Sequence, residues 1–178
     1  MNYSTPKGTF DILPEEAREE DRWKETRRWA YLEEVMKKLS TDYGFSEIRT
    51  PIFEHTNLFV RGVGETSDIV SKEMYTFLDK AKRSISLRPE GTAPVARAFV
   101  QGRLQQLGSF HKLFYIGPYF RYDRPQAGRF RQFHQFGVEA IGRDDPEQDF
   151  EVIDMLITLY KKLGIKDLHI FLNTLGDA

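Results

Sequence analysis

The sequence predicts an α+β fold with a mostly antiparallel sheet flanked by helices. Segments of strand character cluster along the chain and do not alternate strictly with helical segments, which is typical of α+β domains. Two of these segments, 112–121 and 132–141, each show one apolar and one polar face at the alternation of a strand. The chain has 178 residues, of which 40% are hydrophobic, so it can form one domain with a sizeable core.

The composition excludes several classes of protein. The net charge of −1 gives no global basic field, so any affinity for a polyanion must be local. The absence of cysteine excludes disulfides and thiolate metal sites, and the four histidines lack metal-ligand spacing, so we assign no metal to protein side chains. No apolar run approaches the ~18 residues of a membrane span, and the N-terminus has no secretory h-region. We therefore expect a cytoplasmic protein with no membrane partner.

The first predicted elements are a long helix and a short strand. Pro14, followed by two glutamates, is typical of a first helical turn, and apolar residues then recur at helical spacing up to Leu39. Gly44 is placed to end this helix. The sequence thus predicts a helix over 14–41 and a strand over 45–51.

The remaining elements follow the same signals. Thr92 is predicted to be the N-cap of a helix, and Asp145-Pro146 opens another, which carries Phe150 and Tyr160 on one face. The predicted order is a hairpin-like pair of strands, a helix, two long strands, a helix and a last strand: 72–79, 83–91, 93–107, 111–120, 132–142, 146–164 and 167–176.

The two long strands carry unusual polar faces. The second places an amide, a glycine and a carboxylate (Gln135, Gly137 and Glu139) on the face opposite Phe136. The first places Gly117 on its polar face. Glycine weakens a strand interior but lets a ligand approach the backbone. We therefore expect a flat ligand to lie on this face of the sheet.

The connection between these strands, Tyr122 to Arg131, is long and basic. Hairpin loops usually have two to five residues, and longer loops are often functional. From Arg121 to Arg131 there are four arginines and one acid, Asp123. Arginine forks match phosphate oxygens and rings stack on bases, so the loop indicates a site for a nucleotide phosphate or an RNA end. The alternative is a solvated hairpin whose arginines pair with surface acids.

A second constellation, "RPEGT", lies where a strand turns into a helix. Helix capping is one explanation, and it suits Thr92. Glu90 has another possible use, because a carboxylate beside a glycine turn at the end of a sheet could receive an ammonium group.

These segments resemble the class II aminoacyl-tRNA synthetases, in the form of the histidyl-tRNA synthetase family. Residues 120–142 resemble motif 2, and "GFSEIRTPIFEH" resembles motif 1, including Pro51. Four further segments resemble the same family in the same order: "PKGTFDILPEE", "GVGETSDIVSKEMYTF", "LRPEGTAPVARA" and "LNTLG". The resemblance implies a class II antiparallel catalytic core that activates histidine with ATP and Mg²⁺ and then transfers it to tRNA-His.

The resemblance also implies roles for the residues of motif 2. Arg121 matches the catalytic arginine that binds the α-phosphate and the histidine carboxylate, and Phe133 matches the ring that stacks on adenine. Asp123 stands near the adenine amino group, where the family usually has glutamate, so this contact departs from the family pattern. Arg129 and Arg131 match the loop that faces ATP phosphates and the tRNA acceptor end.

The implied histidine site uses residues from both constellations. Glu90 and Thr92, helped by Gln135, match the residues that hold the α-ammonium group of histidine. Glu139 matches the carboxylate that accepts an imidazole N–H and gives specificity.

The resemblance stops short of a whole synthetase. Residues 1–178 are expected to form the N-terminal portion of the catalytic domain, with motifs 1 and 2 but without motif 3 or the anticodon-binding domain, and to have little activity alone. The implied partners are L-histidine, tRNA-His and a second copy bound through motif 1. The alternative is a non-catalytic paralogue that binds histidine or tRNA, such as a regulatory subunit of histidine biosynthesis or a stress-sensor domain.

Overall fold

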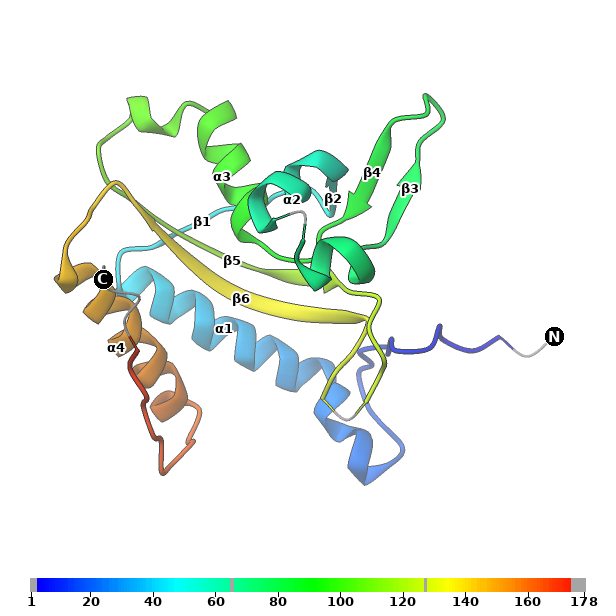
Figure 1. The fold of residues 1–178 in the computed structure, drawn as a ribbon. Coiled ribbons are helices and arrows are strands. Elements are labelled where there is room, and N and C mark those ends of the chain that lie inside the picture. Colours follow the sequence, from blue (N-terminus) through cyan, green and yellow to red (C-terminus); the bar gives the residue numbers. More distant parts are fainter. Residues whose placement is uncertain (1–2, 65, 127, 174–178) are drawn as a thin grey trace.

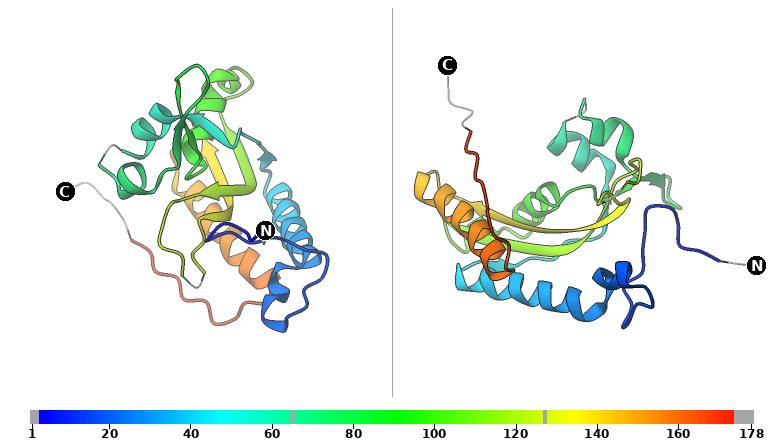
Figure 2. Two further views of the ribbon diagram at one scale, coloured as in Figure 1. Left: turned by 90° about the vertical axis from the view of Figure 1, so that its right-hand side faces the viewer. Right: turned by 90° about the horizontal axis from the view of Figure 1, so that it is seen from below.

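The fold is organised around two long antiparallel strands, as the sequence predicts. The computed structural model describes residues 3–64, 66–126 and 128–173. In it, β5 (His111–Phe120) pairs with β6 (Gln132–Ile141) over their whole lengths, and β1 (Ser46–Glu47) joins β5 in parallel. Figure 1 shows α1 and α4 on one side of these strands and α2, α3 and a smaller sheet on the other. The right-hand view of Figure 2 shows the molecule from below.

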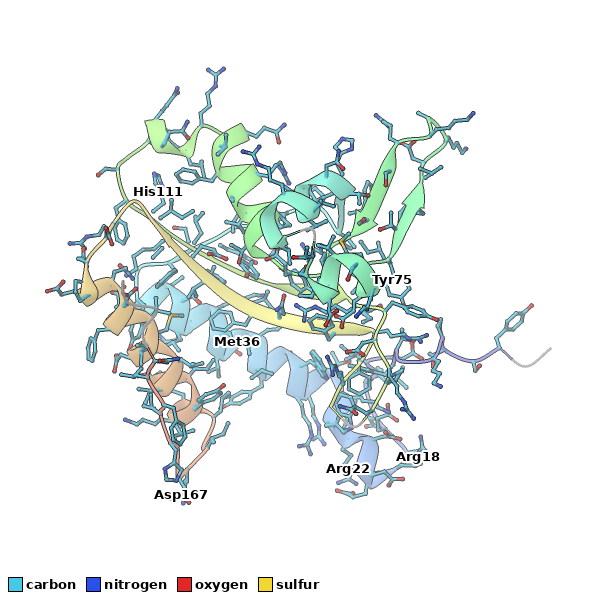
Figure 3. All side chains as sticks on the ribbon, viewed as in Figure 1. Arg18, Arg22, Met36, Tyr75, His111 and Asp167 are labelled. Atoms are coloured by element: carbon cyan, nitrogen blue, oxygen red, sulfur yellow. The ribbon has the colours of Figure 1, made fainter. Side chains whose placement is uncertain are left out.

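The side of the sheet that faces α1 and α4 holds the main core. Phe114 and Ile116 of β5 and Phe136 and Val138 of β6 pack together with Leu39. Leu39 and Phe114 are buried there with Phe45, Met155 and Leu159, and the other three are partly buried. Met36 lies in the same layer, between α1 and β6 (Figure 3). This confirms the predicted apolar face, and each such side chain contributes roughly 1.5–3 kcal/mol when fully buried.

Helix α1 (Thr26–Asp42) begins later than predicted. A 3-10 turn, Glu19–Lys24, precedes it. The backbone of Leu13 accepts a hydrogen bond from the Thr26 N–H at 2.8 Å and donates one to Lys24 at 3.3 Å. The chain must turn back between these residues, so a helix cannot run on from Pro14. The predicted end is confirmed, because the helix stops at Asp42 and Gly44 has a φ of 78°.

The smaller sheet has the order β2-β4-β3 and confirms the predicted hairpin-like pair. Its strands are β2 (Phe53–His55), β3 (Thr76–Leu78) and β4 (Ser84–Leu87). Ser86 is fully buried, and its hydroxyl group lies within hydrogen-bond distance of the hydroxyl groups of Thr56 and Thr76. Along the chain, α2 (Thr56–Val63) and a π-helical turn, Ile69–Glu73, come between β2 and β3.

Helix α3 (Thr92–Gln101) is shorter than predicted. Gly102 follows it, and Arg103 then adopts a left-handed φ of 54°, which no α-helix contains. A separate 3-10 turn, Leu104–Gln106, completes the segment.

Helix α4 (Pro146–Lys162) starts as predicted, since the Asp145 carboxylate accepts the Gln148 N–H at 2.9 Å. It buries Met155 and Leu159, whereas Phe150 is 68% exposed.

The last predicted strand is wrong for the part that the structure describes. Residues 167–173 form no strand, and 174–176 lie outside the described residues. A strand needs a neighbour to share its backbone hydrogen bonds, and none pairs with this segment in the described chain. Phe171 is 91% exposed, so this segment has no apolar face in a core either.

We predict that Met155→Ala destabilises the chain by about 2–5 kcal/mol, because it removes a side chain that is only 2% exposed from the core. Phe150→Ala, on the outer face of the same helix, is the matched control and should change stability by less than about 0.5 kcal/mol. Chemical denaturation of the two variants measures the difference. Equal losses would show that α4 buries a different face.

Candidate active site

The polar face of β5 and β6 holds two carboxylates that Thr92 joins. The Thr92 hydroxyl donates to Glu139 Oε1 at 2.8 Å, and the Thr92 backbone N–H donates to Glu90 Oε2 at 2.6 Å. Glu139 comes from the middle of β6, and the other two residues come from the turn into α3. Long-range folding thus brings together three of the residues that the sequence assigned to histidine binding.

The turn into α3 is capped by Glu90 and not by Thr92, which corrects the sequence prediction. The Glu90 carboxylate accepts the N–H groups of Thr92 and Ala93, the latter at 2.9 Å. The N-cap position is Gly91, and Thr92 makes no side-chain capping bond because its hydroxyl group is bonded to Glu139. Both oxygens of Glu90 therefore carry helix N–H bonds, and the carboxylate is held rigidly at the positive end of α3.

The mid-strand glycines make room for side chains of the chain itself. A Cβ atom on Gly137 would lie 2.3 Å from the ring of Tyr115, and one on Gly91 would lie equally close to the same ring. A Cβ atom on Gly117 would lie 2.7 Å from the guanidinium group of Arg88. The sequence interpretation, in which Gly117 and Gly137 expose backbone to a flat ligand, is therefore corrected.

Burial raises the pKa of the Glu139 carboxyl group. Hydrogen bonds from Thr92 and Tyr115 oppose this change, and the negative charge of Glu90 adds to it. Burial also raises the pKa of the Tyr115 hydroxyl group, with a further contribution from Glu139, so Tyr115 stays a hydrogen-bond donor at neutral pH. In the described chain neither carboxylate has a hydrogen-bonded cation, so the site offers negative charge to a ligand.

Arg121 and Phe133 lie together near the Glu90 carboxylate. The Arg121 Nε–H donates to the carbonyl oxygen of Pro89 at 2.9 Å, next to Glu90 in the chain. The guanidinium carbon lies 5.4 Å from the centre of the Phe133 ring. This one bond fixes the direction of the side chain, and no other hydrogen bond of the guanidinium group is present in the described chain. Its remaining N–H groups are therefore available to an anion.

Gln135 also has a free polar atom. It lies opposite Gly117 in the strand pair, and its Oε1 atom is buried without a hydrogen-bond partner in the described chain. A buried acceptor without a donor costs free energy, about 1–3 kcal/mol in typical proteins. A ligand that brings an N–H group would remove this cost.

Arg88 is a residue of this region that sequence reasoning missed. It is 6% exposed, and its Nε–H donates to the Pro118 carbonyl oxygen while Nη1 donates to that of Thr50, both at 2.9 Å. Its guanidinium carbon lies 4.5 Å from the centre of the Tyr119 ring. Burial raises the pKa of Tyr119 to about 12, against the opposing charge of Arg88. The available signal was the "RPEGT" segment, which begins with this arginine.

The basic loop turns partly on itself. Arg129 forms an ion pair with Asp123, and Asp123 also accepts the backbone N–H of Arg124 at 2.6 Å. Arg131 donates to the Asp123 carbonyl oxygen at 3.1 Å, and its guanidinium carbon lies 4.0 Å from the centre of the Tyr122 ring. The alternative, a hairpin whose arginines pair with acids, thus holds for Arg129, and in the described ranges none of these residues hydrogen-bonds to Glu90, Thr92 or Glu139.

The described residues contain neither a cluster of metal ligands nor a helix that could span a membrane. No group of three or more His, Cys, Asp or Glu side chains lies close enough together there to hold a metal ion. In the same ranges no helix is long and apolar enough to cross a membrane.

Proteins of one family resemble this chain in sequence and in fold. A family model described as histidyl-tRNA synthetase matches residues 8–176. A histidine–tRNA ligase of Protochlamydia amoebophila (strain UWE25) is 57% identical over 176 residues, which are 99% of this chain and 41% of that protein. The structure of apo histidyl-tRNA synthetase from S. aureus matches with a TM-score of 0.74 at 43% identity, over 93% of this chain and 36% of that one.

A third match has a double description. It is a crystal structure from Bacillus halodurans C, described as an ATP phosphoribosyltransferase regulatory subunit/histidyl-tRNA synthetase, with a TM-score of 0.70 and 26% identity. It covers 91% of this chain and 38% of that one.

The antiparallel sheet, its charged face and these matches define part of a class II aminoacyl-tRNA synthetase. The chain belongs to the histidyl-tRNA synthetase family, which confirms the resemblance seen in the sequence. It spans about two fifths of the length of the curated relatives that it matches.

We predict that Glu139→Gln raises the melting temperature of the unliganded protein at pH 7 more than at pH 4. The raised pKa means that folding favours the protonated form of the Glu139 carboxyl group. The contribution of this group to stability is therefore present below pH 4.5, its ordinary pKa, and is lost as pH rises through the folded-state pKa. The amide removes this loss.

Glu151→Gln is the control of opposite sign for this pH dependence. Burial acts to raise the pKa of Glu151, but hydrogen bonds from Lys112 and Gln148 and nearby positive charges lower it overall. Its contribution is present above its unfolded-state pKa and is lost as pH falls through the folded-state pKa, so this variant should lose stability at pH 7. Melting curves across this pH range measure both effects, and a Glu139→Gln difference that shrinks as pH rises would contradict the assignment.

Proposed function

We propose that the protein carrying this chain is a histidine–tRNA ligase. In the first step a histidine carboxylate oxygen bonds to the α-phosphorus of ATP and pyrophosphate leaves. In the second step a hydroxyl group of the terminal tRNA-His nucleotide bonds to the histidyl carbonyl carbon and AMP leaves. Mg²⁺ enters with ATP as part of the substrate. The observation that carries the proposal is the pair of carboxylates joined by Thr92 beside the free guanidinium end of Arg121.

Charge and hydrogen bonding support a histidine ligand. The amino acid presents an ammonium group and an imidazole N–H, and the proposed site offers Glu90, Glu139 and the unpartnered Gln135 oxygen. We assign the ammonium group to Glu90, Thr92 and Gln135, and the imidazole N–H to Glu139. A hydrogen bond to a charged group contributes about 1.5–3 kcal/mol.

Arg121 supports the chemical step. We propose that its free N–H groups bind the histidine carboxylate and the α-phosphate while Phe133 stacks on adenine. A fixed guanidinium group stabilises the negative charge that develops on the α-phosphoryl oxygens, and its bond to Pro89 means that little reorganisation is needed.

The basic loop is the proposed contact for ATP phosphates and the tRNA acceptor end. Arg129 and Arg131 would exchange their present partners for phosphates, since arginine binds phosphate oxygens bidentately. Asp123 is the proposed acceptor for the adenine amino group. Its ion pair with Arg129 must open for both roles.

The proposal concerns the protein that carries the chain. We propose that residues 1–178 are the N-terminal portion of its catalytic domain and aminoacylate tRNA negligibly alone, because no segment of this sequence resembles motif 3 or an anticodon-binding domain. A protein that charges tRNA would work in the cytoplasm, where translation takes place.

A second candidate function has one specific observation in its favour. The structure from Bacillus halodurans C is described as a regulatory subunit as well as a synthetase. A non-catalytic paralogue would bind histidine or tRNA without activating histidine. The joint presence of Arg121, Gln135 and Glu139 favours the ligase, and histidine binding without ATP–pyrophosphate exchange would favour the paralogue.

We predict that the ligase is a homodimer joined through motif 1. Large apolar side chains beside Pro51 are exposed in the single chain, with Ile52 at 44% and Phe53 at 55%, and so is Tyr31 of α1 at 58%. Burial of these side chains across a two-fold axis would remove them from water. Sedimentation equilibrium of the full protein should give twice the chain mass, and a monomer at all concentrations would contradict the prediction.

We predict that two substitutions separate binding from chemistry in histidine-dependent ATP–pyrophosphate exchange by the full protein. Glu139→Ala should raise KM for histidine at least ~10-fold and leave KM for ATP near the parent value, because it removes a charged hydrogen-bond partner.

Arg121→Ala should lower kcat at least ~100-fold, the effect of losing one preorganised donor. Near-parental kcat in the second variant would make Arg121 structural, and unchanged KM in the first would remove Glu139 from the histidine site.

A further inference from the structure

Tyr115 occupies an unusual place on the polar face of the sheet. Its ring lies between two glycines from different parts of the chain, Gly91 before α3 and Gly137 in β6. A Cβ atom on either glycine would come within 2.3 Å of the ring, closer than any contact can be. Neither glycine has a positive φ, so close approach, and not backbone conformation, is the reason for glycine at both positions.

The Tyr115 hydroxyl group reaches the carboxylate that the proposed function assigns to the imidazole. It donates to Glu139 Oε1 at 3.4 Å, and the Thr92 hydroxyl donates to the same oxygen at 2.8 Å. Both donors therefore converge on one oxygen of Glu139. In the described chain Oε2 has no protein donor, so it is the oxygen that remains for a ligand.

We propose that Tyr115 is a positioning residue for histidine recognition: its ring fixes the spacing between the α3 turn and β6, and its hydroxyl group fixes the rotation of the Glu139 carboxylate so that Oε2 faces the ligand. The proposal rests on the ligase function above. It explains why the two glycines and the tyrosine occur together, because a larger side chain at Gly91 or Gly137 would displace the ring and release the carboxylate.

The ionisable groups that face Glu139 give this positioning a pH signature. They are Tyr115 and Tyr119 of β5 and Glu90 before α3. The Tyr115 hydrogen bond acts to lower the pKa of Glu139, against burial and the charge of Glu90. Loss of the hydroxyl group therefore raises the pKa of Glu139, and a larger fraction of the protein then holds a protonated carboxyl group at mildly acidic pH.

The test compares Tyr115→Phe with the parent in the full-length protein. This substitution keeps the ring between the glycines and removes only the hydroxyl group. It should raise KM for histidine about three- to tenfold, the size of one net hydrogen bond, with kcat and KM for ATP nearly unchanged. The acid limb of kcat/KM for histidine should move to higher pH. Histidine titrates equally in both assays, so the difference reports the enzyme.

Two further variants and a binding measurement make the result decisive. Tyr43→Phe is the matched control, because the Tyr43 hydroxyl group also bonds a carboxylate, that of Asp154, but in the packing between α1 and α4. It should leave KM for histidine and the pH profile unchanged. Gly137→Ala should weaken histidine binding more than Tyr115→Phe, because it displaces the ring itself. Calorimetric titration with histidine measures affinity even where a variant has lost activity.

The outcomes separate the inference from the function on which it rests. A parent without histidine-dependent exchange would refute the ligase function. An active parent with Tyr115→Phe indistinguishable from it in KM, affinity and pH profile would refute the positioning role alone. An equal effect of Tyr43→Phe would show that the loss is one of general stability, and it would refute the positioning role as well.

Discussion

The site depends on one buried cation, Arg88, whose charge is met by backbone carbonyl oxygens. A buried charge without such partners costs several kcal/mol. The segments that carry these carbonyl groups must therefore keep them directed at the Arg88 guanidinium group. These carbonyl groups belong to the motif 1 segment, at Thr50, and to β5, at Pro118. The backbone of Arg88 adds a bond to Phe120, and the next residue, Pro89, accepts the bond that orients Arg121. Arg88 and Pro89 thus link the proposed dimer segment, the central strand and Arg121, the proposed catalytic arginine.

From this anchor the site extends along the polar face as a row of glycines and large side chains. Gly117 leaves space for Arg88, and Gly137 leaves space for Tyr115. The opposite face of the same strands packs against α1 and α4 and forms the hydrophobic core. A strand pair can carry both tasks because its side chains alternate between faces, so that stability and chemistry use different residues.

The sequence predicts those features whose cause is local. The alternation in β5 and β6 gives both strands and their faces, and Asp145-Pro146 gives the start of α4. Sequence-based prediction fails where a contact between distant residues determines the local structure. The backbone bond of Leu13 with Thr26 makes α1 begin later than predicted. The Thr92 hydroxyl group donates to Glu139, 47 positions away, and so does not cap α3. Tyr115 and Arg88 were missed as site residues for the same reason. Their partners lie on other elements, and a glycine in the sequence does not say which side chain fills the space beside it.

The N-terminal segment ends its extended path at Gly8, whose carbonyl oxygen accepts the Arg131 N–H at 2.7 Å and that of Gln132 at 3.3 Å. Gly8 has a φ of 84°, and a Cβ atom there would lie 2.8 Å from the Arg131 side chain, so glycine is required on both counts. The segment around Gly8 therefore holds the end of the basic loop in place through backbone hydrogen bonds. For protein engineering this sets a limit: a truncation that removes Gly8 removes these bonds to the loop, although it deletes no residue of the site.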